Sequence, residues 1–222
     1  MHLAVETSLR PEFTTALAHR LLTGASTNLI SLHGQGRRRT LADLHTALSD
    51  GLHIFRMDMR TYKHDYQGFY NELRMQSGYP TMGGNQLTQL LDALEKTASP
   101  CLLILHNFDA LHHSEAVQAG YNSHFMDTLN SISERAGISL LCISECNHQF
   151  YLFAEDGPEL PGSTLQAEAI QLPPLTREQI RAELLRRKII LAEDQLSALT
   201  SHLLRQESPY TEICELALKD KP

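Results

Sequence analysis

The sequence has no long apolar run. Its longest strongly apolar stretch is Cys101–Leu105, whereas a transmembrane helix needs about 20 consecutive apolar residues. Residues 1–6 also lack a basic stretch followed by an apolar one, so no secretory signal is visible. We therefore expect no membrane association and predict a cytoplasmic protein.

Cysteine, glycine and proline are not enriched. Four cysteines among 222 residues are too few for a disulfide framework in a chain of this size. Twelve glycines and nine prolines exclude collagen and low-complexity disorder. The remaining composition, 42% hydrophobic and 20% charged, is that of a globular protein. At roughly 150 residues per domain, the length predicts one large domain, or one domain with a small appendage.

Positive charge is in deficit. Nineteen Lys and Arg against 26 Asp and Glu give a net charge of −7, whereas proteins that bind nucleic-acid phosphates are usually basic. Nucleic-acid binding by the chain alone is therefore disfavoured. A local basic patch stays open as an alternative, because four cations share one predicted helix, partly offset by Glu178 and Glu183. These cations are Arg181, Arg186, Arg187 and Lys188.

Five apolar runs predict the strands of a sheet. They are Asn28–His33, Leu52–Met57, Cys101–His106, Ile138–Ser144 and Glu168–Leu172. Between the runs, apolar residues recur every three or four positions, which is typical of helices. This alternation predicts an α/β body with a parallel sheet, residues 1–173. After Pro174 the pattern is helical only, so residues 174–222 are expected to form a small helical subdomain.

The loop after the first run is the most informative segment. Gly34 and Gly36 lie in a basic turn that leads through Arg38 and Arg39 to Thr40 and an amphipathic helix. This is the setting of a phosphate-binding P-loop, in which backbone N–H groups hold phosphate and the hydroxyl holds Mg²⁺. The residues differ from those of the P-loop motif: Arg39 stands at the position of its lysine and Arg38 at that of its last glycine. A basic strand-to-helix turn without a ligand is the alternative.

The order of the other segments resembles the AAA+ and STAND families of P-loop ATPases. The run Cys101–His106, with Asn107 and Asp109 after it, resembles their Walker B neighbourhood, and Ser144 stands where sensor 1 lies. Leu172–Ile180 resembles the linker and first helix of their lid. The resemblance implies a P-loop NTPase-like three-layer sandwich with a parallel five-stranded sheet and a small C-terminal helical lid.

The resemblance also implies ATP or ADP as the ligand, with Mg²⁺ if the nucleotide is bound. The residues implied for nucleotide binding are Gly34, Gly36, Arg38, Arg39 and Thr40. The Walker B-like residues are His106, Asn107 and Asp109, and Ser144 is the sensor 1-like residue. Arg39 is the expected phosphate cation, with Arg37 and Arg38 solvated or facing a partner.

Several catalytic groups of such ATPases are missing. His106 and Asn107 stand where two acids hold the Mg²⁺ shell and polarise the attacking water. Asp109 is the catalytic candidate only if the chain is active. Residues 136–176, the usual source of a trans arginine finger, contain no Lys or Arg. We therefore do not expect an efficient ATPase, and leave open whether the chain is an enzyme.

The function predicted from these features is a non-hydrolysing or weakly hydrolysing adaptor or regulatory subunit. It would work with a protein partner or as an oligomer, through the acidic stretch Glu145–Glu168. One alternative is an active ATPase or switch that uses Arg39, Thr40 and Asp109. Another is a subunit that assembles on DNA, as in replication-initiator or transposition-type relatives.

Two further chemistries are weaker candidates. Four histidines lie close in sequence, but none forms a recognised ligand pattern with a Cys or Glu, so no metal site is expected. They are His106, His112, His113 and His124. Cys142 and Cys146 favour a buried cysteine and a loop cysteine over a redox pair.

Overall fold

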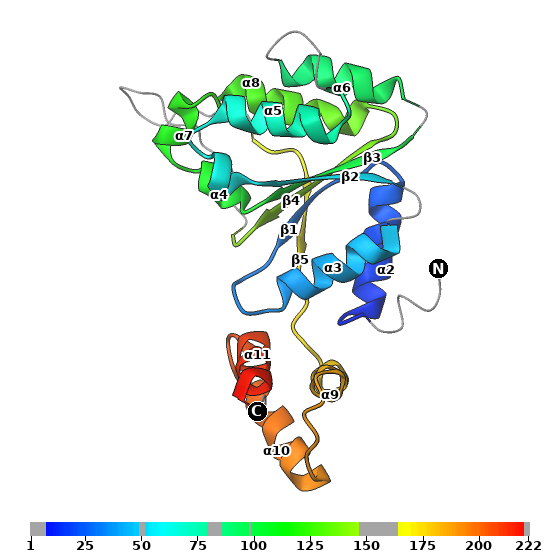
Figure 1. Cartoon of the computed structure of the whole chain (residues 1–222), viewed down its shortest axis with the longest axis vertical. Coiled ribbons are helices and arrows are strands. Elements are labelled where there is room, and N and C mark those ends of the chain that lie inside the picture. The colour runs from blue at the N-terminus through cyan, green and yellow to red at the C-terminus, as the bar shows by residue number, and fades with distance from the viewer. Residues whose placement is uncertain (1–7, 49–51, 80–85, 98, 147–163, 220–222) are drawn as a thin grey trace. The chain divides into compact units, whose positions relative to one another are not determined.

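The computed structural model describes residues 8–48, 52–79, 86–97, 99–146 and 164–219. The chain forms two compact units that interleave along the sequence (Figure 1). Residues 19–30 and 49–171 form what we call the sheet unit. Residues 1–18, 31–48 and 172–222 form what we call the loop–lid unit. The division at residue 173 expected from the sequence stays a prediction.

The sheet has five parallel strands in the order β2-β3-β4-β1-β5. They are β1 (Ser26–Ile30), β2 (His53–Asp58), β3 (Cys101–His106), β4 (Ile138–Ser144) and β5 (Glu168–Gln171). The expected parallel sheet with strands out of sequential order is confirmed. The expected P-loop and Walker B strands, β1 and β3, are both interior and flank the central strand β4.

The first strand differs from its prediction. The sequence predicts the strand within the apolar run Asn28–His33, whereas β1 runs from Ser26 to Ile30. Leu32 lies beyond the strand and is 61% exposed, while the polar Thr27 and Asn28 are buried. The burial of Asn28 is compensated by a hydrogen bond, which its side-chain oxygen accepts from Ser144 on β4. Apolar character alone therefore placed the strand too far along the chain.

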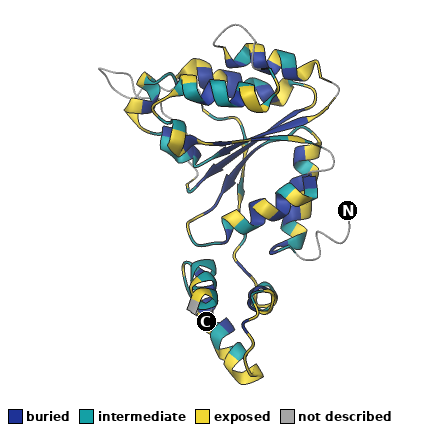
Figure 2. Cartoon of the chain, in the orientation of Figure 1, coloured by how far each residue is buried: buried dark blue, intermediate teal, exposed yellow. Residues whose placement is uncertain are grey.

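The helices of the sheet unit lie along one side of the sheet, with α5, α6 and α8 in one layer (Figure 1). The set is α4 (Met59–Tyr62), α5 (Tyr66–Gln76), α6 (Leu87–Glu95), α7 (Ser114–Gln118) and α8 (Ser123–Asn130). Short 3₁₀ helices span Phe108–Leu111 and Ser131–Glu134. The strands β3 and β4 are buried along almost their whole length (Figure 2), which explains their continuous apolar sequence.

The loop–lid unit contains α3 and the three C-terminal helices. Their bounds are α3 (Arg37–Leu48), α9 (Arg177–Arg186), α10 (Glu193–Leu203) and α11 (Pro209–Lys219), and α2 (Pro11–Leu22) begins in this unit. Thr176 caps α9, because its hydroxyl accepts a hydrogen bond from the Gln179 N–H. An apolar core that includes Leu9, Ile180 and Ile213 joins the lid helices.

The helix expected to begin near Thr40 begins three residues earlier, at Arg37. The Thr40 N–H already bonds to the Gly36 carbonyl at 3.0 Å, so Gly36 is the residue before the first helical turn. None of the helices within the described residues is long and apolar enough to cross a bilayer.

Candidate functional site

Two glycines shape the loop that precedes α3. Gly34 and Gly36 have φ angles of 77° and 80°, a region that favours glycine. A Cβ on Gly34 would lie 2.3 Å from Ser208 Cβ. A Cβ on Gly36 would lie 2.8 Å from Leu9 Cδ2 and 2.9 Å from Tyr210 Cδ2. Both positions therefore require glycine for backbone geometry and for space.

The loop presents its carbonyl groups to the protein. Three consecutive carbonyl oxygens, of His33, Gly34 and Gln35, accept bonds from Ser208 Oγ (3.4 Å), Tyr210 N (3.0 Å) and Arg10 Nη2 (2.7 Å), respectively. Among the described residues, nothing accepts a hydrogen bond from the backbone N–H of Gly34, Gln35, Gly36 or Arg38. The loop thus keeps the polarity of an anion cradle, in which N–H groups at a helix N-terminus bind the ligand.

The three arginines of the loop have different surroundings. Arg39 forms an ion pair with Asp43 at 3.2 Å, one turn along the same helix. Arg38 is exposed. Arg37 donates from Nη1 to the Ser31 carbonyl at 3.3 Å. Arg37 also directly follows the last loop glycine, where the P-loop motif has its lysine, so the geometry favours Arg37 over the expected Arg39 as the phosphate cation.

Thr40 is fully buried, and its hydroxyl oxygen accepts a hydrogen bond from Arg10 Nη1 at 3.0 Å. The geometry therefore favours a structural role for Thr40 over the expected Mg²⁺-binding one. Arg10 is itself only 1% exposed and also donates from Nε to the Pro173 carbonyl at 2.9 Å. Burial lowers the pKa of Arg10 to about 10. Sequence reasoning missed Arg10, because no motif marks it.

A second buried charge lies in the lid. The Glu183 carboxylate is almost fully buried and accepts hydrogen bonds from Arg186, Arg187 and the Tyr210 hydroxyl. Burial by itself raises the pKa of Glu183, but the bonds from the two arginines outweigh it and hold the pKa below its usual value. Arg181 pairs with Glu193. Three of the four cations on the predicted basic face are therefore already paired.

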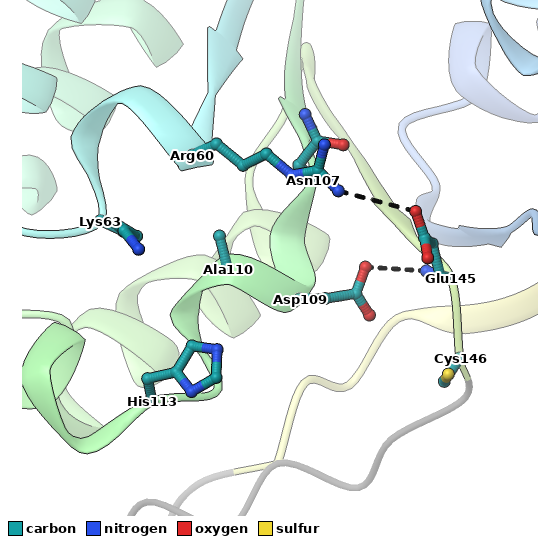
Figure 3. A pocket seen from close by; sticks show the side chains of 8 residues that line it. All are labelled: Arg60, Lys63, Asn107, Asp109, Ala110, His113, Glu145 and Cys146. Carbon is teal, nitrogen blue, oxygen red and sulfur yellow. Dashed lines mark hydrogen bonds and ion pairs between the residues drawn. The ribbon is translucent and has the colours of Figure 1, made fainter. Parts of the chain in front are cut away.

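A pocket of about 420 Å³ lies in the sheet unit, at the carboxyl ends of β3 and β4 (Figure 3). Its lining residues are Arg60, Lys63, Asn107, Asp109, Ala110, His113, Glu145 and Cys146. It contains two of the predicted Walker B-like residues, Asn107 and Asp109. The third, His106, ends β3 and pairs in register with Asp58 of β2.

Asn107 is held in place by its neighbours. Its side-chain amide donates to Asp58 Oδ1 at 2.8 Å. Its φ of 52° lies in the left-handed region, which Asn tolerates better than most residues. Asp58 also caps α4 by accepting from the Arg60 N–H. Asp58 is a carboxylate that sequence reasoning missed at this edge of the sheet, although its place at the end of a strand could have indicated it.

Asp109 is hydrogen-bonded to the backbone just beyond the end of β4. Its Oδ2 accepts a hydrogen bond from the Glu145 N–H at 2.7 Å (Figure 3). Its Oδ1 is buried and has no hydrogen-bond partner among the described residues. The Glu145 carboxylate faces Arg60, with 3.7 Å between the charged atoms. Asp109 therefore holds the end of β4, and its free oxygen atom is shielded from water.

Ser144, the sensor 1-like residue, is buried, and its hydroxyl donates to Asn28 at 2.7 Å. Cys142 is buried, which raises its pKa, whereas Cys146 is exposed, and both are free thiols. No group of three or more metal-ligating side chains gathers among the described residues. Most of the expected partner-binding stretch, residues 147–163, lies outside the described residues.

No family model and no curated protein sequence matches the chain. Solved structures do. Domain III of the replication initiation protein DnaA from Thermotoga maritima is 12% identical with a TM-score of 0.61, covering 97% of this chain and 85% of that one. The Aeropyrum pernix ORC1 protein, in complex with DNA, is 17% identical with a TM-score of 0.59 and covers 96% of this chain.

Cdc6p from Pyrobaculum aerophilum is 19% identical with a TM-score of 0.56, covering 88% of this chain. The chain spans 52% of the length of that protein and 61% of the ORC1 protein. At these identities the likeness concerns the fold. The expected α/β class is thereby confirmed: the chain has the P-loop NTPase fold of AAA+ ATPases, with a parallel five-stranded sheet and C-terminal helices.

Proposed function

We propose that the chain is an AAA+-type regulatory or adaptor subunit that binds nucleotide phosphate at residues 34–38 with little or no hydrolysis. The observation that carries the proposal is the end of β3, where an imidazole and an amide stand in place of two acids. His106 and Asn107 occupy these positions, and the Asn107 amide is bound to Asp58. Neither side chain supplies a carboxylate to a Mg²⁺ shell or to an attacking water.

The neighbouring carboxylates do not replace the missing pair. Asp109 is bound to the Glu145 N–H, and Asp58 to Asn107 and the N-terminus of α4. A positioned general base contributes about 10²–10⁴-fold to a rate. We therefore expect hydrolysis to be at least about 100-fold slower than in an intact enzyme of this fold.

Phosphate binding is supported by the loop. The N–H groups of Gly34, Gln35, Gly36 and Arg38 are not used by the described residues, and α3 directs the positive end of its dipole to the same place. Arg37 supplies a cation at the lysine position of the motif. A solved replication initiator DnaA bound to AMPPCP and single-stranded DNA, 14% identical with a TM-score of 0.58, shares this fold.

Nucleotide binding and hydrolysis are tested together on the purified chain. ATP at 100 times its dissociation constant should add about 2.7 kcal/mol to the free energy of unfolding, while phosphate release stays undetectable. Arg37→Ala should reduce the thermal shift caused by ATP, and Arg38→Ala, at the adjacent exposed position, should leave it unchanged. Phosphate release at about 1 s⁻¹ or faster, lost in Asp109→Asn, would show an active ATPase instead.

Gly36→Val, the obvious loop variant, is a poorer test of nucleotide binding. Its side chain would collide with Leu9 and Tyr210, so it would destabilise the loop with or without a nucleotide. The pair Arg37→Ala and Arg38→Ala avoids this problem, because both arginines carry their charge at the end of a long side chain.

Assembly on DNA is the second candidate. It is supported by solved neighbours in complex with DNA, among them ORC1 from Aeropyrum pernix and ORC from Drosophila. It is opposed by the net charge of −7 and by the ion pairs of Arg181, Arg186 and Arg187. DNA binding measured at about 50 and 200 mM salt tests this candidate, because a contact driven by DNA phosphates weakens steeply with salt. A chain that binds no DNA at the lower salt concentration would contradict it.

A further inference from the structure

Arg10 is a buried cation without an acidic partner among the described residues. Its guanidinium instead donates to three acceptors: the Gln35 carbonyl and the Thr40 hydroxyl, which are close in the sequence, and the Pro173 carbonyl, which is far from both. Gln35 is in the loop, Thr40 is in the first turns of α3, and Pro173 lies just before the lid helices. A buried charge is retained only where it is well bonded, so these three bonds require all three segments to be in place.

The residue before Arg10 makes a second set of contacts with the same loop. The Leu9 N–H donates to Asp43 Oδ2 at 2.8 Å, a buried bond to the middle of α3. The Leu9 side chain lies close to the Gly36 Cα, since a Cβ there would be 2.8 Å from Leu9 Cδ2. Leu9 also belongs to the apolar core of the lid, together with Ile180 and Leu184.

The lid contacts the loop from its other end. The Tyr210 N–H at the start of α11 donates to the Gly34 carbonyl at 3.0 Å, and Gln35 Nε2 donates to the Glu207 carbonyl at 2.5 Å. Ser208 lies so close to Gly34 that residue 34 has no room for a side chain. Loop residues 33–36 are thus held by residues 9–10 and by residues 207–210.

We propose that Arg10 is a positioning residue that latches the lid helices to the loop, so that the loop–lid unit is assembled by the chain's own side chains before any nucleotide binds. A nucleotide then adds little to the order of the lid. A partner would meet the same lid surface in the nucleotide-free and nucleotide-bound chain. The proposal does not depend on hydrolysis or on nucleotide binding, because it concerns the nucleotide-free protein.

Hydrogen exchange of the full chain, without nucleotide and with EDTA, tests the latch. In the wild type the Tyr210 N–H should be protected. In Arg10→Met its exchange should accelerate about tenfold, while the amides of β3 and β4 keep their protection and show that the sheet is intact. Arg20→Met is the matched control, since Arg20 lies on α2, the helix that begins directly after Arg10, but forms an exposed ion pair with Glu168. It should behave as the wild type does.

Two results overturn the latch. One is an unchanged Tyr210 exchange rate in Arg10→Met with β3 and β4 still protected. The other is a wild-type Tyr210 that exchanges freely until ADP is added. If Arg10→Met loses protection throughout, Arg10→Lys decides: it keeps the charge but cannot reach three acceptors, so Tyr210 should exchange faster than in the wild type. An Arg10→Lys protein identical to the wild type would equally refute the latch.

Discussion

The two units of the chain are stabilised in different ways. In the sheet unit, Tyr66, Phe69, Tyr121 and Phe125 pack edge to face or tilted, with ring centroids 5.0–6.0 Å apart. In the loop–lid unit, the buried side chains of Arg10, Asp43 and Glu183 connect the segments in addition to the apolar core of the lid. Apolar packing is tolerant of direction, whereas a buried polar network is stable only in one geometry.

This difference explains why the conformation of loop residues 33–36 is narrowly specified. The loop glycines, their carbonyl acceptors and Arg10 form bonds that a shift of about 1 Å would break. The pocket at the ends of β3 and β4 is instead lined by side chains that are partly exposed. Different interactions therefore maintain the loop and the pocket, so the sequence of one can change without altering the geometry of the other.

The largest effect is expected in the aromatic cluster. Phe125→Ala removes a buried ring that contacts Tyr66, Phe69 and Tyr121. It should lower the free energy of unfolding by about 3–5 kcal/mol in a urea titration. Met75→Ala, in the same unit but exposed, should change it by less than about 0.5 kcal/mol. Similar losses for the two variants would mean that the cluster is not the core of this unit.

In the loop–lid unit, Glu183→Gln should have the next largest effect. It removes the charge that Arg186 and Arg187 share, at a cost of about 2–3 kcal/mol, less than for a fully buried pair because the Arg186 side chain is 44% exposed. Glu193→Gln, at an exposed ion pair with Arg181, is the control and should cost less than about 1 kcal/mol.

The Glu183 effect should also depend on pH. The pKa of Glu183 is lower in the folded chain than its usual value, so its contribution is fully present above the unfolded-state pKa, about 4.3. It is lost as the pH falls through the lower folded-state pKa. The difference between wild type and Glu183→Gln should therefore be constant from about pH 7 to 5 and shrink below about pH 4. A difference that grows on acidification would contradict the assignment.

The strands β3 and β4 of the sheet unit were predicted well from the sequence, because most of their residues are apolar and buried. The runs Cys101–His106 and Ile138–Ser144 match β3 and β4 to the residue. Burial on both faces of a parallel strand leaves a continuous apolar run, which is easily recognised. The strand β1 was placed too late for the same reason, since its buried Thr27 and Asn28 are polar.

The sequence predicted the loop but not what holds it. Gly34 and Gly36 were expected, whereas the helix start at Arg37 and the role of Arg10 were not. Arg10 reaches Pro173 across most of the chain, and nothing local in the sequence indicates a bond over such a separation. Thr40 was singled out because it is a hydroxyl residue after a basic loop. That pattern fits a Mg²⁺ ligand and a structural hydrogen-bond acceptor equally well.

Thr40→Val separates those two roles. If Thr40 is the acceptor for Arg10, the variant leaves a buried donor unsatisfied and should cost about 2 kcal/mol without nucleotide or metal. The stabilisation added by ATP and Mg²⁺ should then be the same as in the wild type. A Mg²⁺ ligand would give the reverse: unchanged stability of the nucleotide-free chain and a smaller shift on adding ATP and Mg²⁺. Thermal melts with and without Mg²⁺ measure both.

The smallest effect is expected at Asn107, in the sheet unit. Asn107 adopts a left-handed backbone and bonds to Asp58. Asn107→Gly loses the bond but relieves the backbone, whereas Asn107→Ala loses the bond and keeps a conformation that costs a residue with a Cβ about 1 kcal/mol. Ala should therefore be less stable than Gly by about 1 kcal/mol in urea.

The usual order of these two residues is the opposite, since Gly loses more backbone entropy on folding. An Ala variant as stable as the Gly variant would mean that the turn after β3 relaxes and that Asn107 is free to move towards a ligand. The predicted order would show that the left-handed turn after β3 is rigid, which holds the wild-type Asn107 side chain against Asp58.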